Sequence, residues 1–320
     1  GGRVSLVEVI SIGEALIQFN AVTKGPLRHV TLFEKHVAGA EANVAVCVSR
    51  LGRSAAFIGR VGNDEFGECI KSWLRGEGVD TRWVKTDPDA PTGIYFVQRG
   101  YPIPNRSSMV YYRRMSAGSR LSPEDVKEEA FVDAKILHFT GITPALSPTA
   151  KEAVLRALDL AKKAGVKVSV DTNIRLPLWP SLEEAAKVLM PMVEKADILF
   201  TDPTDAEILI GESDPDKILT AFRGIGIDTV VVKLGEKGAV ALSGEESAKA
   251  EAIQVTVEDP IGAGDAFAGT FLACRLAGRN LLESLRKATL VGSLVTTVRG
   301  DQEMIPTHRD LDVVYRYYYP

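Results

Sequence analysis

Short runs of β-branched and apolar residues alternate with helical segments along most of the chain. The pattern predicts strands at residues 4–12, 55–61, 135–139, 166–170, 197–200, 229–233, 239–242 and 252–257. It predicts helices at residues 38–52, 65–75, 147–163, 182–194 and 215–222, and a mostly helical C-terminal third from residue 266. Strands separated by helices of about ten or more residues pair in parallel, with helices on both faces. We therefore expect an α/β fold around a mainly parallel sheet.

Two segments interrupt this alternation. Residues 14–38 alternate in polarity and contain the turn formers Gly25 and Pro26, which favours short, half-exposed strands over a helix. Residues 92–114 contain two β-rich runs, GIYFVQRG and SSMVYYRR, on either side of YPIPN, which is the pattern of a β-hairpin. We predict that the two segments form a small β-sheet lid, inserted into an otherwise single α/β domain spanning residues 1–320.

The sequence DPIGAGDAFAG, at residues 259–269, leads into an apolar run that looks helical. Small residues at a loop-to-helix junction let backbone N–H groups bind an anion, and the helix dipole adds to the attraction. Phosphate binding alone needs no carboxylate, whereas phosphoryl transfer needs a group that accepts the proton of the attacking hydroxyl. Asp265 is therefore the candidate catalytic base, with Gly262, Ala263 and Gly264 as the candidate anion hole. The alternative is that Asp265 only caps the helix and the small residues only permit tight packing.

Two common nucleotide-binding signatures are absent. No GxxxxGK[ST] motif occurs, and GAGDAFAG does not fit GxGxxG because Phe267 takes the place of the third glycine. These absences argue against a P-loop ATPase and against a standard dinucleotide dehydrogenase.

Ligands of parallel α/β sheets bind at the carboxyl ends of the strands, where Gly13, Asp171, Lys233 and the Gly262 loop are expected. The sequence DTNIR would place Asn173 and Arg175 at the same edge. A loop ion pair with a turn-forming Asn is the alternative explanation of DTNIR.

The sequence KLGEKG, at residues 233–238, joins a strand end to two glycines. Such a segment would let an adenine or a ribose lie against the backbone, although a β-turn explains it equally well.

Alternation along VYYRR places Tyr111 and Arg113 on one face of the predicted lid. A guanidinium fork suits a carboxylate, which ordinary hexoses lack. This face therefore favours a sugar acid as substrate. The alternative is that Arg113 is a solvated strand residue.

Composition excludes several classes of protein. The chain carries 38 basic and 42 acidic residues, a net charge of −4, and its pI of about 5.7 argues against nucleic-acid binding through a broad basic face. Cys47, Cys69 and Cys274 form no CxxC pair and the histidines show no HExxH spacing, so neither a disulfide framework nor a zinc site is indicated. No uncharged apolar run approaches the ~18 residues of a membrane span, and GGRVSLVEV lacks the regions of a signal peptide. We expect a cytoplasmic protein.

Several motifs together resemble those of the ribokinase-type (PfkB) carbohydrate kinases. They are DPIGAGDAFAG, AGAEANVAVCVSRLG followed by IGRVGNDEFG, and KLGEKGAVAL, which occur in the family's order over nearly the whole chain. Within the family, GEALIQFN, RGYPIP, VYYRR with SAGSRLSPED, and DTNIRLPLW resemble the archaeal 2-keto-3-deoxygluconate kinases. The resemblance implies a Rossmann-like core, a β lid over the sugar, ATP as phosphoryl donor and Mg²⁺ as companion ion.

The resemblance also implies roles for individual residues. Substrate contacts are implied for Gly39, Asn43, Tyr95, Tyr111, Arg113, Arg175, Asp265 and Asp301, with Arg175 on the substrate or the transferring phosphate. Nucleotide contacts are implied for Asn173, Arg175, Lys233, Gly235, Glu236, Lys237, Gly238, Gly262 and Gly264. The alternative interpretation of Asp301, which follows Gly300, is that it is an exposed residue without a role in binding. The motif PTDAE departs from the family pattern, with Thr204 in place of an Asn, so Glu207 is a weaker candidate for organising the metal ion. Gln18 stands where kinases of neutral sugars carry an Asp.

From these observations we expect an ATP-dependent kinase that phosphorylates the terminal hydroxyl of 2-keto-3-deoxygluconate to give the 6-phosphate, with 2-keto-3-deoxygalactonate as a further candidate substrate. One alternative is another kinase of the family, acting on fructose, ribose or a nucleoside. A second alternative is a catalytically silent sugar-binding or regulatory protein on the same scaffold, against which the intact GAGD argues. The exposed lid edge predicts a homo-oligomer formed through the lid.

Overall fold

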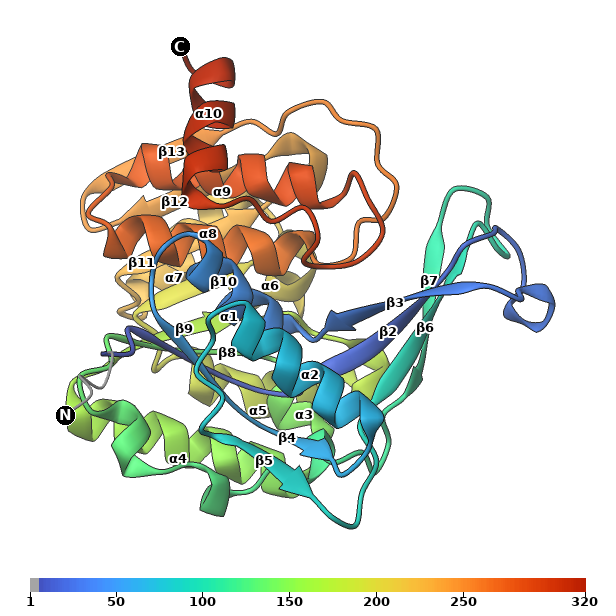
Figure 1. Ribbon diagram of the computed structural model, residues 1–320. Helices are drawn as coiled ribbons and strands as arrows, with labels where there is room; N and C mark the ends of the chain where they lie inside the picture. Colours follow the sequence, from blue (N-terminus) through green and yellow to red (C-terminus); the bar gives the residue numbers. More distant parts are fainter. Residues whose placement is uncertain (1–5) are drawn as a thin grey trace.

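The fold of residues 6–320, described from a computed structural model, is built on a nine-stranded sheet with helices on both faces (Figure 1). Its strand order is β13-β12-β11-β10-β9-β8-β1-β4-β5. Pairing is parallel from β5 to β11, and β12 and β13 add antiparallel at one edge. The strands are β1 (Val9–Ile12), β4 (Ala55–Gly62), β5 (Val84–Asp87), β8 (Ile136–Thr140), β9 (Lys167–Asp171), β10 (Ile198–Thr201), β11 (Thr229–Lys233), β12 (Ala239–Ser243) and β13 (Glu246–Ala250). The mainly parallel α/β sheet predicted from the sequence is confirmed.

Apolar side chains of the central strands are buried on both faces, which is why these strands read as nearly continuous hydrophobic runs. One core contains Phe57, Phe200 and Phe271, and the other contains Phe139 and Phe222. The helices that cover the sheet are α1 (Ala40–Arg50), α2 (Glu65–Gly76), α3 (Thr143–Leu146), α4 (Pro148–Ala164), α5 (Leu182–Val193), α6 (Pro203–Ile210), α7 (Pro215–Gly224), α8 (Ala263–Leu276), α9 (Leu281–Val295) and α10 (His308–Tyr318). No helix within residues 6–320 is long and apolar enough to cross a membrane.

A second, four-stranded sheet projects from the side of the main body (Figure 1). Its strands are β2 (Leu16–Ala21), β3 (Phe33–Ala38), β6 (Ile94–Arg99) and β7 (Ser107–Tyr112), in the order β3-β2-β6-β7. The hairpin predicted within residues 92–114 is β6 and β7, and the strands predicted within residues 14–38 are β2 and β3. The expectation of half-exposed strands is wrong for β2, which is mostly buried because Phe19 packs against Phe66 of α2 on one side and the cavity described below lies on the other.

Three of the predicted elements are absent or have a boundary that differs by more than two residues from the structure. The strand expected at residues 252–257 is absent, and β13 lies earlier, at Glu246–Ala250. Beyond β13 the chain leaves the sheet edge, and its next backbone bonds run from the N–H groups of Glu258 and Asp259 to the carbonyl of Thr296. Helix α8 starts at Ala263 instead of 266, so Asp265 lies inside the first helical turn. The first strand begins at Val9, and residues 4 and 5 of its predicted range lie outside the described residues.

The remaining short elements are 3₁₀ turns. They are η1 (Leu27–His29), η2 (Gly118–Arg120), η3 (Pro123–Asp125), η4 (Glu128–Phe131), η5 (Leu176–Leu178) and η6 (Gly235–Lys237).

Candidate active site

A cavity of about 410 Å³ opens at the carboxyl ends of the parallel strands, beneath the small sheet. This is the edge at which ligands of parallel α/β sheets bind. Both the main sheet and the small sheet contribute side chains to its wall. The lining includes Gly39, Tyr95, Tyr111, Arg113, Asp171, Asn173, Arg175, Lys233, Gly235, Gly262, Gly264, Asp265 and Asp301. Gly13 is not part of the wall; a Cβ there would collide with the Glu41 carboxyl group beneath it.

The start of α8 lines the cavity at the place where DPIGAGDAFAG predicts an anion cradle. Gly262 is the N-cap residue and adopts a left-handed conformation with φ +86°, which favours glycine. The loop before it is held by Asp259, whose Oδ1 accepts a hydrogen bond of 3.1 Å from the Ile261 N–H group. The first N–H groups of a helix have no partner inside the helix, so they can bind an anion in the cavity.

Asp265 lies in the first turn of α8 with only 9% of its surface exposed. Asn43 of α1 donates hydrogen bonds of 2.9 Å from its Nδ2 to Oδ2 of Asp265 and to Oδ2 of Asp301. The pKa of Asp265 is raised to about 8, chiefly by burial and also by the neighbouring carboxylates of Asp301 and Asp171, against the lowering effect of the Asn43 hydrogen bond. A carboxyl group with a raised pKa at the helix start is suited to proton transfer near neutral pH.

Asp301 is buried, with 3% of its surface exposed, so the reading of it as an exposed loop residue is wrong. Gln18 of β2 donates from Nε2 to Oδ1 of Asp301 at 2.8 Å and to the Tyr95 hydroxyl at 2.5 Å. Burial raises the pKa of Asp301 to about 6. Gln18 is fully buried and is absent from the cavity wall, so it orients Asp301 and Tyr95 without lining the cavity.

Lys233, at the end of β11, brings a cation to the cradle. Its Nζ lies 2.6 Å from Oδ2 of Asp171, at the end of β9. The same Nζ lies 3.3 Å from the position that a Cβ atom on Gly264 would take. Burial lowers the pKa of the Lys233 ammonium, but Asp171 more than offsets this and the pKa is raised overall. A charged ammonium group therefore lies beside the N–H groups of the α8 start.

The wall of the cavity also contains Tyr111, Arg113 and Arg175. The Arg113 guanidinium carbon lies 5.2 Å from the centre of the Tyr111 ring, and the rings of Tyr95 and Tyr111 are 5.1 Å apart. Arg113 is not the solvated residue of the alternative reading, because it is 8% exposed and paired with Glu14. Arg175 is exposed at the mouth. The cavity wall thus combines the start of α8 with a cationic and aromatic group of side chains.

The profile of the pfkB family carbohydrate kinases matches residues 7–308 of this chain. The chain belongs to this family. It is 46% identical over 309 residues to the 2-dehydro-3-deoxygluconokinase of Thermoproteus tenax, covering 96% of this chain and 94% of that protein. It is 34% identical to the probable fructokinase-3 of Arabidopsis thaliana, covering 93% and 88%. The fold matches a putative ribokinase II from E. coli in complex with ATP and Mg²⁺, with a TM-score of 0.91 and 30% identity over 98% of this chain and 100% of that one.

As a carbohydrate kinase of this family, the protein uses ATP with Mg²⁺. The cavity fits a nucleotide at the side of Gly235, where left-handed backbone with φ +58° and open space lie next to Lys233. Asn173 and Gly235 line the wall, whereas Glu236 and Lys237 are exposed outside it and Gly238 is buried behind it. Ala263, at the cradle, is also absent from the wall. The roles of these residues stay predictions.

The kinase holds no group of three or more His, Cys, Asp or Glu side chains among residues 6–320 that could bind a metal ion. Mg²⁺ usually keeps several waters and takes one or two carboxylates together with substrate phosphates. Asp202 and Asp205, which sequence reasoning missed, line the cavity and fit that pattern. Burial, together with the nearby Asp202, raises the pKa of Asp205 to about 6. Glu207 is exposed on α6 and lies outside the wall, and its predicted role stays untested.

Glu41 is a further cavity residue that sequence reasoning missed. Its Oε1 accepts hydrogen bonds of 2.7 Å from Thr140 and 2.6 Å from Thr143, and burial raises its pKa. The sequence held one indication that Glu41 lies at the cavity: it follows the predicted substrate contact Gly39 by two residues, in the first turn of α1.

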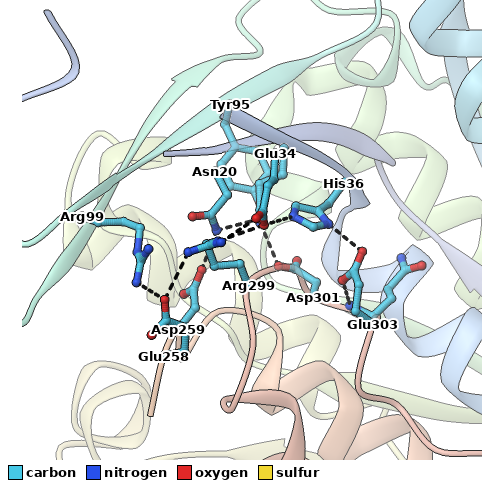
Figure 2. A network of polar contacts seen from close by, with 12 residues as sticks. Asn20, Glu34, His36, Tyr95, Arg99, Glu258, Asp259, Arg299, Asp301 and Glu303 are labelled. Carbon is cyan, nitrogen blue, oxygen red and sulfur yellow. Dashed lines mark hydrogen bonds and ion pairs between the residues drawn. The ribbon is translucent and has the colours of Figure 1, made fainter. Parts of the chain in front are cut away.

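Polar contacts connect the small sheet of the kinase to the loops on both sides of the cradle (Figure 2). Asn20 donates to Oδ2 of Asp259 at 2.7 Å, and Arg299 donates to Glu34 at 2.8 Å. His36 lies 2.7 Å from Glu303, and although burial lowers the pKa of His36, the carboxylates of Glu303 and Glu34 together raise it overall. The small sheet is therefore fastened to residues next to Asp265 and Asp301 in the sequence.

Proposed function

We propose that this carbohydrate kinase phosphorylates the terminal hydroxyl of 2-keto-3-deoxygluconate to give the 6-phosphate. The observation that carries the proposal is that one cavity is lined both by Asp265 with the start of α8 and by Arg113 with Tyr111. A short linear acid that binds Arg113 through its carboxylate would present its terminal hydroxyl to Asp265 in the same cavity. The Thermoproteus relative is named for the same substrate, 2-keto-3-deoxygluconate being another name for 2-dehydro-3-deoxygluconate.

Each side chain of the cavity has a separate role in the proposed reaction. Asp265 accepts the proton of the attacking hydroxyl, and Asn43 keeps its carboxylate oriented. The N–H groups of Gly262, Ala263 and Gly264, with the Lys233 ammonium, stabilise the charge that develops on the transferring phosphoryl group. Asp301 and Tyr95 hold the sugar hydroxyls, and Arg175 neutralises charge at the mouth. Asp202 and Asp205 would hold Mg²⁺, which would supply neutralisation of the phosphate charge.

We further propose that the chain is one domain and that residues 14–38 and 92–114 act as its lid. A lid excludes water from the reacting groups and so prevents hydrolysis of ATP. The two segments meet the cavity through Leu16, Tyr95 and Met109, which supports this role.

A substrate panel tests the proposed reaction. The purified kinase is supplied with ATP, Mg²⁺ and either 2-keto-3-deoxygluconate, 2-keto-3-deoxygalactonate, fructose or ribose, and ADP release is measured. We expect the highest kcat/KM for 2-keto-3-deoxygluconate. A higher value for a neutral sugar would refute the proposal in favour of a fructokinase or ribokinase, and the plant fructokinase relative makes fructose the nearest rival. Turnover of any substrate above background excludes a silent binding protein.

The galactonate epimer is a second proposed substrate. The two keto acids differ at one hydroxyl, and the contacts proposed for the carboxylate serve both of them.

Two further proposals concern the whole molecule. The outer surface of the small sheet exposes Leu32 and Tyr112, with 66% and 63% of their surfaces accessible, which supports a homo-oligomer formed through the lid. The free thiols of Cys47, Cys69 and Cys274 suit a cytoplasmic setting.

A further inference from the structure

Glu14 lies where the chain first crosses from the main sheet to the small sheet, between the end of β1 and the start of β2. The other crossings pass close to the same residue. A Cβ atom on Gly39, in the return crossing after β3, would collide with the main-chain oxygen of Glu14. A Cβ atom on Gly93, just before β6, would lie 2.9 Å from Oε2 of Glu14. Glu14 is 1% exposed, so the crossings are packed around a buried carboxylate.

The last crossing, after β7, supplies the partners of this carboxylate. Arg113 donates from Nε to Oε1 of Glu14 at 2.8 Å, and its Nη2 lies 2.8 Å from the same oxygen. The Ser116 hydroxyl donates to Oε2. A Cβ atom on Gly118 would overlap the Glu14 side chain. A buried charge is costly unless it is paired, so Glu14 and Arg113 cannot separate without a large loss of stability.

The geometry of the pair leaves part of the guanidinium available. An arginine carries about five N–H donors in a planar fork, and the contact with Glu14 uses the Nε side. The Nη1 group and the second Nη2 hydrogen remain, and they form the edge that can bind a carboxylate in a bidentate manner. Arg113 lines the cavity beside Tyr111, whereas Glu14 does not. Glu14 therefore acts on the cavity only through Arg113.

We propose that Glu14 is a positioning residue that presents the free edge of Arg113 to the substrate carboxylate and links that contact to the placement of the small sheet. The substrate assignment within this proposal rests on the proposed function. Glu14 belongs to the first crossing and Arg113 to the last. A substrate carboxylate that binds Arg113 therefore acts on both of these connections between the small sheet and the main sheet. Binding of the substrate carboxylate and closure of the lid are then coupled through the Glu14–Arg113 pair.

The kinetic test compares Glu14→Ala, Glu14→Gln and Arg113→Ala with the double variant Glu14→Ala/Arg113→Ala. We expect Glu14→Ala to raise KM for 2-keto-3-deoxygluconate by about 10- to 100-fold, the effect of a lost charged hydrogen bond, with kcat changed less than about threefold. Glu14→Gln should recover part of the loss, because its amide oxygen still accepts from Nε of Arg113. In the Arg113→Ala background, Glu14→Ala should change KM by less than about threefold. Multiplicative effects of the two substitutions would refute the proposal.

Glu8→Gln is the matched control. Glu8 is also a shielded carboxylate paired with cations, Arg53 and Lys135, but it lies before β1, at the opposite end of that strand from Glu14. We expect its KM for the keto acid to equal that of the wild type. A rise as large as that of Glu14→Ala would show that loss of any such pair disturbs the cavity, which would overturn a specific role of Glu14.

Hydrogen exchange without substrate tests the link to the small sheet. Amides of residues 93–118 should exchange faster in Glu14→Gln than in wild type and in Glu8→Gln, whatever the substrate is. Unchanged exchange there would overturn the link. The two proposals fail separately: a wild-type preference for neutral sugars refutes the substrate assignment, whereas the double-variant and exchange results decide the role of Glu14.

Discussion

The Nδ2 atom of Asn43 lies 2.9 Å from Oδ2 of Asp265. The amide cannot turn over, because its Oδ1 accepts a hydrogen bond of 2.8 Å from Gln302. Gln302 is in turn fixed by the Trp73 indole, which donates to its Oε1 at 2.6 Å. The donor face of Asn43 is thus directed at Asp265. Oδ1 of Asp265 has no partner within residues 6–320, which leaves it free to accept the proton of a substrate hydroxyl.

Asn43→Asp should replace this donor with a third carboxylate between Asp265 and Asp301. We expect kcat/KM to fall by at least about 10²-fold, since the base loses its orientation and like charges oppose its ionisation. Steady-state kinetics with saturating ATP measure the effect. Asn280→Asp is the control, because Asn280 caps α9 through its side chain and Asp caps equally well. Equal kinetics for the two variants would contradict the role given to Asn43.

Asp265→Asn should lower kcat by roughly 10² to 10⁴, the usual contribution of a positioned base. The same substitution should raise thermal stability increasingly with pH. The pKa of Asp265 in the folded wild type is raised to about 8. Folding of the wild type therefore favours the protonated carboxyl, and the wild type loses this stability as the pH rises from the ordinary pKa range of Asp through 8. Asparagine does not titrate. The difference in Tm between variant and wild type should therefore grow from pH 5 to pH 9. A constant difference would contradict a raised pKa of the buried Asp265 carboxyl.

The pH dependence of kcat/KM should show an acid limb near the pKa of about 8 in the free enzyme, because Asp265 works only when deprotonated. Lys233 lowers the pKa of Asp265, so Lys233→Met should move the limb to higher pH. Lys162→Met, at an exposed position on α4 outside the cavity wall, should leave the limb in place. Identical limbs for the two lysine variants would rule out the proposed influence of Lys233.

Gly262→Ala should damage catalysis more than folding. A Cβ atom there would lie 2.8 Å from the Asp301 side chain, and the φ of +86° disfavours alanine. The loop would have to shift, and a displacement of about 1 Å at a reacting group can cost about 10²-fold in rate. Gly278→Ala is the matched control, with φ +75° and open space around it. We expect both variants to lose about 1 kcal/mol or more of stability and only Gly262→Ala to lose kcat. A normal kcat for Gly262→Ala would contradict the close fit of cradle and Asp301.

Local signals in the sequence were sufficient for the elements and the cradle. Apolar runs set the order of strands and helices, because each buries a face on its own period of two or about 3.6 residues. The glycines around Asp265 were recognisable because a left-handed residue and an exposed helix start need small side chains at fixed spacing. Short motifs such as VYYRR also located Arg113. The predicted strand at residues 252–257 failed because its alternating pattern carries no information about whether a neighbouring strand exists.

Contacts between distant segments were decided only by the tertiary structure. Gln18 and Asp301 are 283 positions apart, and Glu14 and Arg113 are 99 apart. Their hydrogen bonds depend on how the small sheet folds back over the strand ends, which no local pattern encodes. The raised pKa of Asp265 likewise arises from burial beside Asp301 and Asp171. By itself the sequence determined that a carboxylate stands at a helix start built of small residues, where an anion can bind. The tertiary structure decided how that carboxylate is held and how Glu14 pairs with Arg113, because both depend on charges that folding buries together.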